Sequence, residues 1–157
     1  MKELLEKILA EIKKNPDGTQ AYEDLYYMSK EAMKTDEALG VRYLKILSEL
    51  IEKQIPIVKS DKGLRFLFGL HKRVLLAAAP FDFDSYLLYV EWNREPDKKF
   101  YPPRRKVLKQ VVDALQELAD DKLDLLAVSL PPGSGKTTLA IFYLTWLGGR
   151  IPNEPVS

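Results

Sequence analysis

Hydrophobic positions along most of the chain recur with the spacing of amphipathic helices. Between residues 2 and 14, apolar side chains return every three or four positions, with lysine and glutamate between them. This spacing gathers the apolar side chains on one helix face. The same pattern returns over 19–34 and 36–54, after the turn sequence Asn15-Pro-Asp-Gly18. It predicts a small helical bundle, or an array of helical hairpins, in residues 1–54.

Three more helices are predicted in the middle of the chain. Ser60 or Asp61 is the expected N-cap of a helix over about 62–79. A short helix is expected to start at Asp84 or Ser85 and to end before Pro96. Pro102 and Pro103 suit the first turn of a longer helix that runs to about Asp121.

A different pattern begins at residue 124. The mainly apolar run 124–130 leads into Pro131-Pro-Gly-Ser-Gly-Lys-Thr-Thr138, and the apolar helical run 139–147 follows. A strand, a glycine-rich turn and a helix in this order are the arrangement of a phosphate-binding P-loop. The predicted fold is therefore mostly α, with an N-terminal helical region followed by the first βα unit of a truncated α/β P-loop ATPase domain.

The chemistry of this turn suits a nucleoside triphosphate. Gly133 and Gly135 allow successive N–H groups to point inward, and the following helix adds its N-terminal donors. Lys136 is the predicted catalytic residue, which would reach the β- and γ-phosphates, and the Thr137 hydroxyl would ligate Mg²⁺. The predicted cofactors are ATP and Mg²⁺. The predicted phosphate-binding residues are Pro132, Gly133, Ser134, Gly135, Lys136, Thr137 and Thr138. The strict pattern has a further glycine where Leu130 stands, so Pro131 and Pro132 supply the turn instead.

Composition narrows the classes of protein that fit. The 157 residues are 46% hydrophobic and 30% charged with a net charge of +1, which is typical of one globular domain or a domain with a fragment. Cysteine is absent and His71 is the only histidine, which excludes disulfides, thiolate metal sites and multi-histidine metal sites. No apolar run approaches membrane-spanning length, so no membrane contact is expected.

Two basic stretches stand out. Residues 55–80 hold five lysines and arginines against Asp61 alone, which indicates a solvated helix face or contact with DNA phosphate or an acidic partner. Phe100-Tyr-Pro-Pro-Arg-Arg105 forms an aromatic-basic box. Tyr101 could stack on a purine base and Arg104 could stack on it or donate to it. The box could equally be an aromatic start to a helix whose basic first turn is solvated.

Three segments together resemble the large terminase subunit of tailed bacteriophages and prophages. They are Tyr89-Val-Glu-Trp-Asn-Arg-Glu-Pro96, Phe100-Tyr-Pro-Pro-Arg-Arg-Lys106 and Leu123-Asp-Leu-Leu-Ala-Val-Ser-Leu-Pro-Pro-Gly-Ser-Gly-Lys-Thr-Thr138. The resemblance covers about 85–157, whereas residues 1–84 carry no recognisable motif. It implies an ATP-driven DNA-packaging motor, with a nuclease in the full-length parent, and it puts Tyr101 and Arg104 near the adenine.

The resemblance also implies partners and a location. These are double-stranded DNA, a small terminase subunit and the portal, on which the parent is oligomeric, in the cytoplasm of a bacterial host. The expected division is a helical region over 1–95 and the start of the ATPase domain over 96–157. Because the chain stops at Ser157, we expect a truncated and inactive N-terminal part of the enzyme. The alternatives are another P-loop ATPase, helicase-like or AAA+, and a non-enzymatic helical module that docks a packaging partner.

Overall fold

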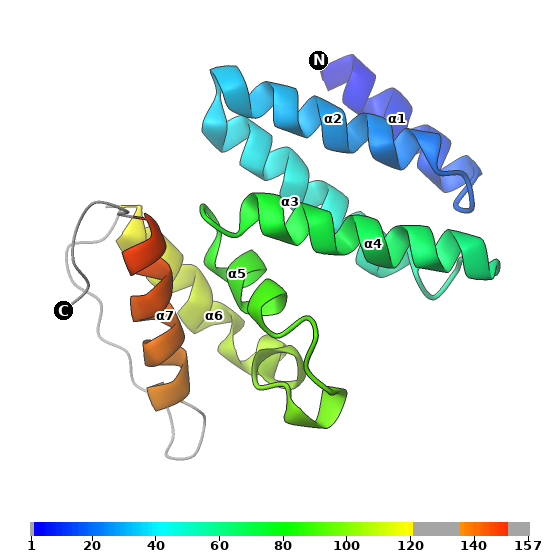
Figure 1. Cartoon of the computed structure of the whole chain (residues 1–157). Helices are drawn as coiled ribbons and strands as arrows, with labels where there is room; N and C mark the ends of the chain where they lie inside the picture. Colours follow the sequence, from blue (N-terminus) through cyan, green and yellow to red (C-terminus); the bar gives the residue numbers. More distant parts are fainter. Residues whose placement is uncertain (1, 121–135, 151–157) are drawn as a thin grey trace. The chain divides into compact units, whose positions relative to one another are not determined.

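The structure is a computed structural model that describes residues 2–120 and 136–150. These residues form seven α-helices and one short 3-10 helix (Figure 1). The helices are α1 (Lys2–Lys14), α2 (Gln20–Thr35), α3 (Glu37–Gln54), α4 (Asp61–Ala78), α5 (Phe83–Val90), η1 (Pro96–Lys98), α6 (Tyr101–Ala119) and α7 (Lys136–Arg150). The hydrophobic spacing predicted every α-helix in this set, with ends that differ by a few residues.

The predicted fold class was wrong in its βα part. Over 2–120 and 136–150 the chain is 82% helical and has no strand or sheet, so a βα P-loop unit is not present there. The strand expected at 124–130 lies outside the described residues. Instead of a sheet, α7 has helical neighbours, because its buried Tyr143 and Trp146 lie against Phe83 of α5. The apolar face of a helix can pack on a sheet or on other helices. The sequence pattern of α7 did not indicate which of these two neighbours it has.

The chain divides into two compact units. Unit 1 is Met1–Ala78 and holds α1 to α4, and unit 2 is Ala79–Ser157 and holds the later helices. The division comes earlier than the predicted boundary at 95/96. The reason is that α5 packs against α6 and belongs with the segment that follows it.

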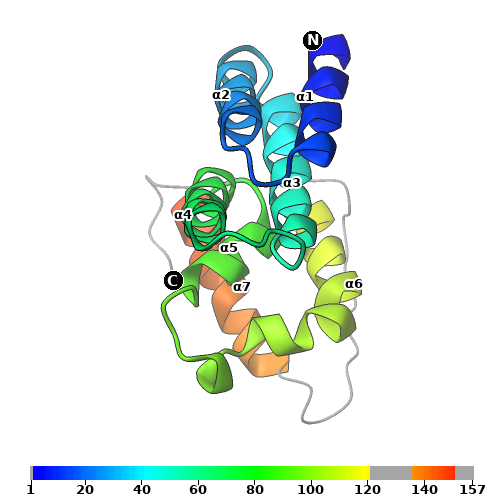
Figure 2. The same cartoon turned by 90° about the vertical axis from the view of Figure 1, so that its right-hand side faces the viewer.

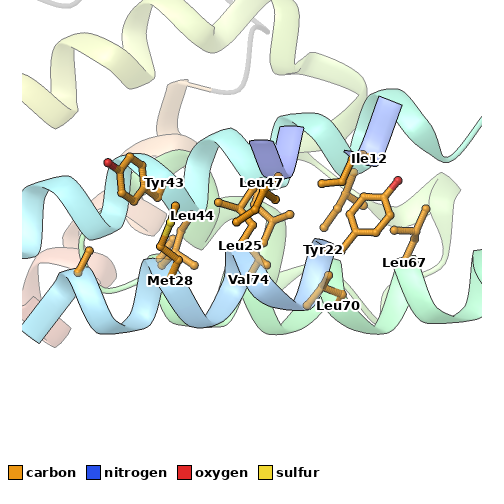
Figure 3. Close-up of a cluster of buried hydrophobic side chains, with 14 of the residues drawn as sticks. Ile12, Tyr22, Leu25, Met28, Tyr43, Leu44, Leu47, Leu67, Leu70 and Val74 are labelled. Carbon is orange, nitrogen blue, oxygen red and sulfur yellow. The ribbon is translucent and has the colours of Figure 1, made fainter. Parts of the chain in front are cut away.

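Unit 1 is built around the apolar stripes of its four helices. α2 packs on α1 and α3, and α3 packs on α4. The core side chains come from all four helices and converge between them (Figure 3). The labelled members are Ile12, Tyr22, Leu25, Met28, Tyr43, Leu44, Leu47, Leu67, Leu70 and Val74. Among the tyrosines of α2, Tyr22 is fully buried in this core, whereas Tyr27 is exposed.

Helix starts follow the predicted capping residues in part. The Asp36 carboxylate accepts from the Leu39 backbone N–H at 3.2 Å, and the Ser60 hydroxyl accepts from Gly63 at 3.0 Å. Thr19 holds the N-cap position of α2 without a side-chain hydrogen bond. In unit 2 the cap of α5 is Asp82, earlier than expected. Short polar side chains satisfy free N–H groups at helix starts, which is why these residues mark them.

His71 joins α3 and α4 inside unit 1. Its Nε2 lies 3.2 Å from the Ser48 hydroxyl and 3.6 Å from Oε1 of Glu52. The imidazole is buried, so it belongs to the packing between α3 and α4. Both of these oxygen atoms lie near the same ring nitrogen, Nε2.

Unit 2 has a core rich in aromatic side chains, to which α5, α6 and α7 all contribute. Figure 2 shows the ribbons of these three helices. The Phe83 ring centroid lies 5.1 Å from that of Trp146 and 5.3 Å from that of Tyr143. Two buried hydrogen bonds fix α7 further. Trp146 Nε1 donates to the Ala79 carbonyl at 2.7 Å, and the Tyr143 hydroxyl donates to the Leu115 carbonyl at 3.0 Å. Aromatic residues with satisfied polar atoms stabilise such a core through both area and geometry.

Candidate functional site

The aromatic-basic box forms the start of α6, and a buried carboxylate from outside the helix caps it. Both oxygens of Glu91 accept backbone N–H groups, from Phe100 at 2.6 Å and from Tyr101 at 2.8 Å. The Glu91 side chain is fully buried, and the Arg94 guanidinium lies 3.2 Å from it. An anion at a helix N-terminus is stabilised by the N–H groups and by the helix dipole.

This carboxylate also explains how the box tolerates its basic first turn. Cations at a helix N-terminus oppose the dipole, so an anionic partner is needed to offset them. A bound nucleotide was one candidate for that partner, but Glu91 supplies the charge from within the chain. The next two residues, Pro102 and Pro103, have no N–H to offer. The first turn of α6 therefore has little capacity left to bind a phosphate through its backbone.

Asp84 of α5 is the second buried carboxylate beside the box. It accepts from Arg105 twice, from Nε at 3.1 Å and from Nη2 at 2.8 Å, and it accepts from the Tyr101 hydroxyl. Lys109 lies 3.8 Å away. Bidentate pairing of arginine with a carboxylate is strong and directional. Asp84 therefore ties α5 to the first two turns of α6.

These contacts shift two ionisation equilibria in opposite directions. Burial alone raises the pKa of the Asp84 carboxyl. The hydrogen bonds and charge of Arg105, with help from Tyr101 and Lys109, outweigh burial and hold that pKa below its usual value. Burial, with the charge of Asp84, raises the pKa of the Tyr101 hydroxyl. Tyr101 is thus a neutral donor to an ionised carboxylate near neutral pH.

Asp84 should make unit 2 sensitive to acid. Because its pKa is lower in the folded state than in the unfolded chain, its contribution is present above the unfolded value of about 4 and is lost as pH falls through the folded value. We expect Asp84→Asn to lower the free energy of unfolding at pH 7, and the difference from wild type to shrink at about pH 3. Urea unfolding followed by tryptophan fluorescence would measure both. A difference that is constant with pH would contradict an ionised role for Asp84.

The structure brings the box to α7 through a stack of three side chains. The Arg104 guanidinium carbon lies 4.9 Å from the Phe100 ring centroid, and the Phe100 ring is stacked on Phe142 with centroids 6.1 Å apart. Arg104 is exposed and also donates to the Phe100 carbonyl at 2.8 Å. Phe142 lies six residues after the first residue of α7, or roughly 9 Å along the helix.

The other predicted base-contacting residue is placed differently. Tyr101 is fully buried, with its hydroxyl turned to Asp84. A purine could not stack on its ring without moving it. Of the predicted pair, only Arg104 presents its side chain to solvent.

The predicted phosphate-binding residues lie at and before the start of α7. Pro132, Gly133, Ser134 and Gly135 fall outside the described residues, as do the side chains of Lys136 and Thr137. The backbone of α7 begins at Lys136, which puts Lys136, Thr137 and the exposed Thr138 in its first turn.

The residues present fit Mg²⁺ only in part. Mg²⁺ is usually held by one or two carboxylates together with phosphate oxygens. In 2–120 and 136–150 no group of three acidic or histidine side chains gathers around a common point. Thr137 would therefore hold the ion together with the oxygens of a bound nucleotide.

Sequence reasoning missed Asp84 and Glu91, which organise the box. A signal was available, because a helix that starts with two prolines and three cations requires an anion from elsewhere. Glu91 also interrupts an otherwise apolar run. The spacing does not tell which of several nearby acids turns inward, so only the packing of α5 on α6 identifies them.

Comparison with known protein-family models, curated proteins and solved structures finds no match to this chain. Among the described helices, none has both the length and the apolar character needed to cross a membrane.

Proposed function

We propose that the chain is part of the large subunit of a terminase-like DNA-packaging ATPase, and that residues 132–138 bind the phosphates of ATP. One observation carries the proposal: Pro-Pro-Gly-Ser-Gly stands immediately before the first residue of α7. Lys136 and Thr137 then belong to a first helical turn, where backbone N–H groups and the helix dipole favour an anion. Phosphate binding of this kind needs a glycine-rich turn and a helix start, and it does not depend on a neighbouring strand.

The residues have distinct roles in this proposal. Gly133 and Gly135 let the backbone approach the phosphate oxygens closely, and Lys136 neutralises their charge. Thr137 presents its hydroxyl to Mg²⁺, which when bound would neutralise charge on the transferring phosphoryl group. Arg104, exposed on the stack against Phe142, is the candidate to contact the nucleotide from the α6 side. Tyr101 contributes by positioning Asp84.

The remaining assignments come from the resemblance to terminases. Double-stranded DNA would be the substrate that the parent moves. A small terminase subunit and the portal would be its protein partners, with the motor oligomeric on the portal, in the bacterial cytoplasm.

Titration of ATP with Mg²⁺ into the full chain, followed by calorimetry, tests the proposal. We expect saturable binding that Lys136→Ala abolishes, because the lysine charge is the largest single attraction for the terminal phosphates. Lys106→Ala is the matched control, since it removes an exposed lysine on α6 and should leave binding unchanged. Absence of binding to the wild-type chain, or equal binding by both variants, would contradict the proposal.

A second candidate function belongs to unit 1, as a helical module that docks another macromolecule. The observation in its favour is that unit 1 has a hydrophobic core of its own, formed by α1 to α4. Its folding therefore does not draw on the residues of the proposed nucleotide site.

A further inference from the structure

The solvent face of α4 combines cations with apolar side chains. The residues on it are Lys62, Arg65, Phe68, Gly69, Lys72, Arg73 and Leu76, which we call the α4 face. At 100° per residue these positions form one continuous arc opposite the buried stripe that includes Leu67, Leu70 and Val74. The four cations extend over roughly 16 Å of helix.

The charge of this face is not neutralised within the described part of the chain. The only acidic residue of α4 is Asp61, its first residue. None of the four cations forms an ion pair with a carboxylate in 2–120 and 136–150, and the Arg73 guanidinium lies 4.7 Å from the ring centroid of Tyr26. A single-sign strip of this kind attracts a partner of the opposite charge.

The apolar residues of the face distinguish between kinds of acidic partner. Phe68 is 49% exposed and Leu76 is 52% exposed. They stand two helical turns apart among the cations. A phosphate backbone would pair with the cations but would leave these two apolar side chains exposed to solvent. A protein surface with apolar residues and carboxylates would contact both the apolar side chains and the cations. Protein interfaces commonly have an apolar centre and a polar rim.

Gly69 has no side chain and therefore leaves a notch in this face. A Cβ added there would meet nothing within 4 Å, so the packing of unit 1 does not require a glycine at this position. Glycine in a helix interior is up to about 1 kcal/mol less favourable than alanine, so Gly69 destabilises the helix. By helical position it lies between Arg65, Lys72 and Leu76 and leaves a notch among them. A side chain from a partner helix would fill such a notch, as in knobs-into-holes packing.

We propose that the α4 face docks an acidic amphipathic helix of a partner protein, whose apolar stripe covers Phe68 and Leu76 and fills the notch at Gly69. Carboxylates beside that stripe pair with Arg65 and Lys72. This deepens the docking function given above for unit 1 and is independent of ATP binding at residues 132–138.

The test uses the full chain and a labelled synthetic helix, with binding followed by fluorescence anisotropy. The probe has leucine at the a and d positions of a heptad repeat and glutamate at most other positions, and the comparison peptide has lysine in place of glutamate. We expect the acidic peptide alone to bind, with an affinity that falls as salt is added. Failure of the acidic peptide to bind at millimolar concentration overturns the proposal.

Charge reversal locates the site. Arg65→Glu with Lys72→Glu should lower the affinity for the acidic peptide at least tenfold and create affinity for the basic one. Lys7→Glu with Lys14→Glu, on the exposed side of α1, changes net charge equally and should leave both results as in wild type. Equal effects of the two double variants would mean that net charge alone drives binding, and would overturn the proposal.

Apolar and shape variants separate a helix from other polyanions. Phe68→Ala and Gly69→Leu should each weaken binding of the acidic peptide several-fold. Binding of a duplex DNA oligonucleotide that the charge reversal abolishes, with no binding of the acidic peptide, would overturn the helix as partner. It would leave the docking function of unit 1 standing with nucleic acid in its place.

Discussion

Glu91→Ala is expected to lower the free energy of unfolding of unit 2 by about 3 kcal/mol. The buried carboxylate of Glu91 accepts both backbone N–H groups at the start of α6 and pairs with Arg94. Its removal leaves the two donors without a partner, together with a basic first turn whose charge opposes the dipole. Because both tryptophans of the chain, Trp92 and Trp146, belong to unit 2, urea unfolding followed by tryptophan fluorescence reports on this unit.

Glu95→Ala is the matched control for this effect. Glu95 lies four residues away and forms an ion pair with Lys98 at 3.7 Å, in which both side chains are largely exposed. Exposed pairs contribute little, so we expect a change below about 0.5 kcal/mol. Glu91→Gln keeps an acceptor but loses the charge, and should fall between the two. Equal stability of the Glu91→Ala and Glu95→Ala proteins would show that the cap is not important for α6.

Gly40→Ala should destabilise unit 1 by about 2 kcal/mol, a drop of roughly 10 °C in its melting temperature. An added Cβ would lie 2.6 Å from the Met33 backbone nitrogen and 2.8 Å from the Met33 Cα. Backbone atoms cannot turn aside as a flexible side chain can, so α2 and α3 would have to separate. That cost exceeds the gain of about 1 kcal/mol that alanine brings to a helix. Thermal unfolding followed by circular dichroism measures the change.

Gly69→Ala provides a control of opposite sign in the same unit. Both glycines stand inside helices, but a Cβ at Gly69 meets nothing. Only the helix propensity acts there, so the melting temperature should rise. If both variants shift in the same direction, the close approach at Gly40 does not limit the packing of unit 1.

The hydrophobic spacing was sufficient to predict the seven helices, because helix period and capping residues are local properties. Ser60 caps α4 as predicted, and Asp36 caps α3 at the start of the predicted segment 36–54. The division into compact units was harder to predict, since the break at Glu95-Pro96 resembles a linker as much as the division after Ala78 does. A helix ends near each of these two positions, and only the packing of α5 on α6 distinguishes one position from the other.

The aromatic-basic box shows where local reasoning fails for the site. From the sequence, Tyr101 and Arg104 are equally suitable as base-contacting residues, since each side chain can contact a base. In the fold, Tyr101 is buried against Asp84, whereas Arg104 is exposed over Phe100. The difference arises because α5 supplies a carboxylate to one side of α6 alone.

The sequence by itself determined which segments are helical, which faces are apolar and where a glycine-rich sequence precedes the first residue of α7. These follow from backbone geometry and side-chain spacing over a few residues. Tertiary structure alone decided that α7 packs on helices, that Glu91 and Asp84 turn inward to organise the start of α6, and that Gly40 is crowded while Gly69 is open. An apolar stripe, an acid or a glycine has many compatible neighbours, and its role is fixed only when distant segments pack against it.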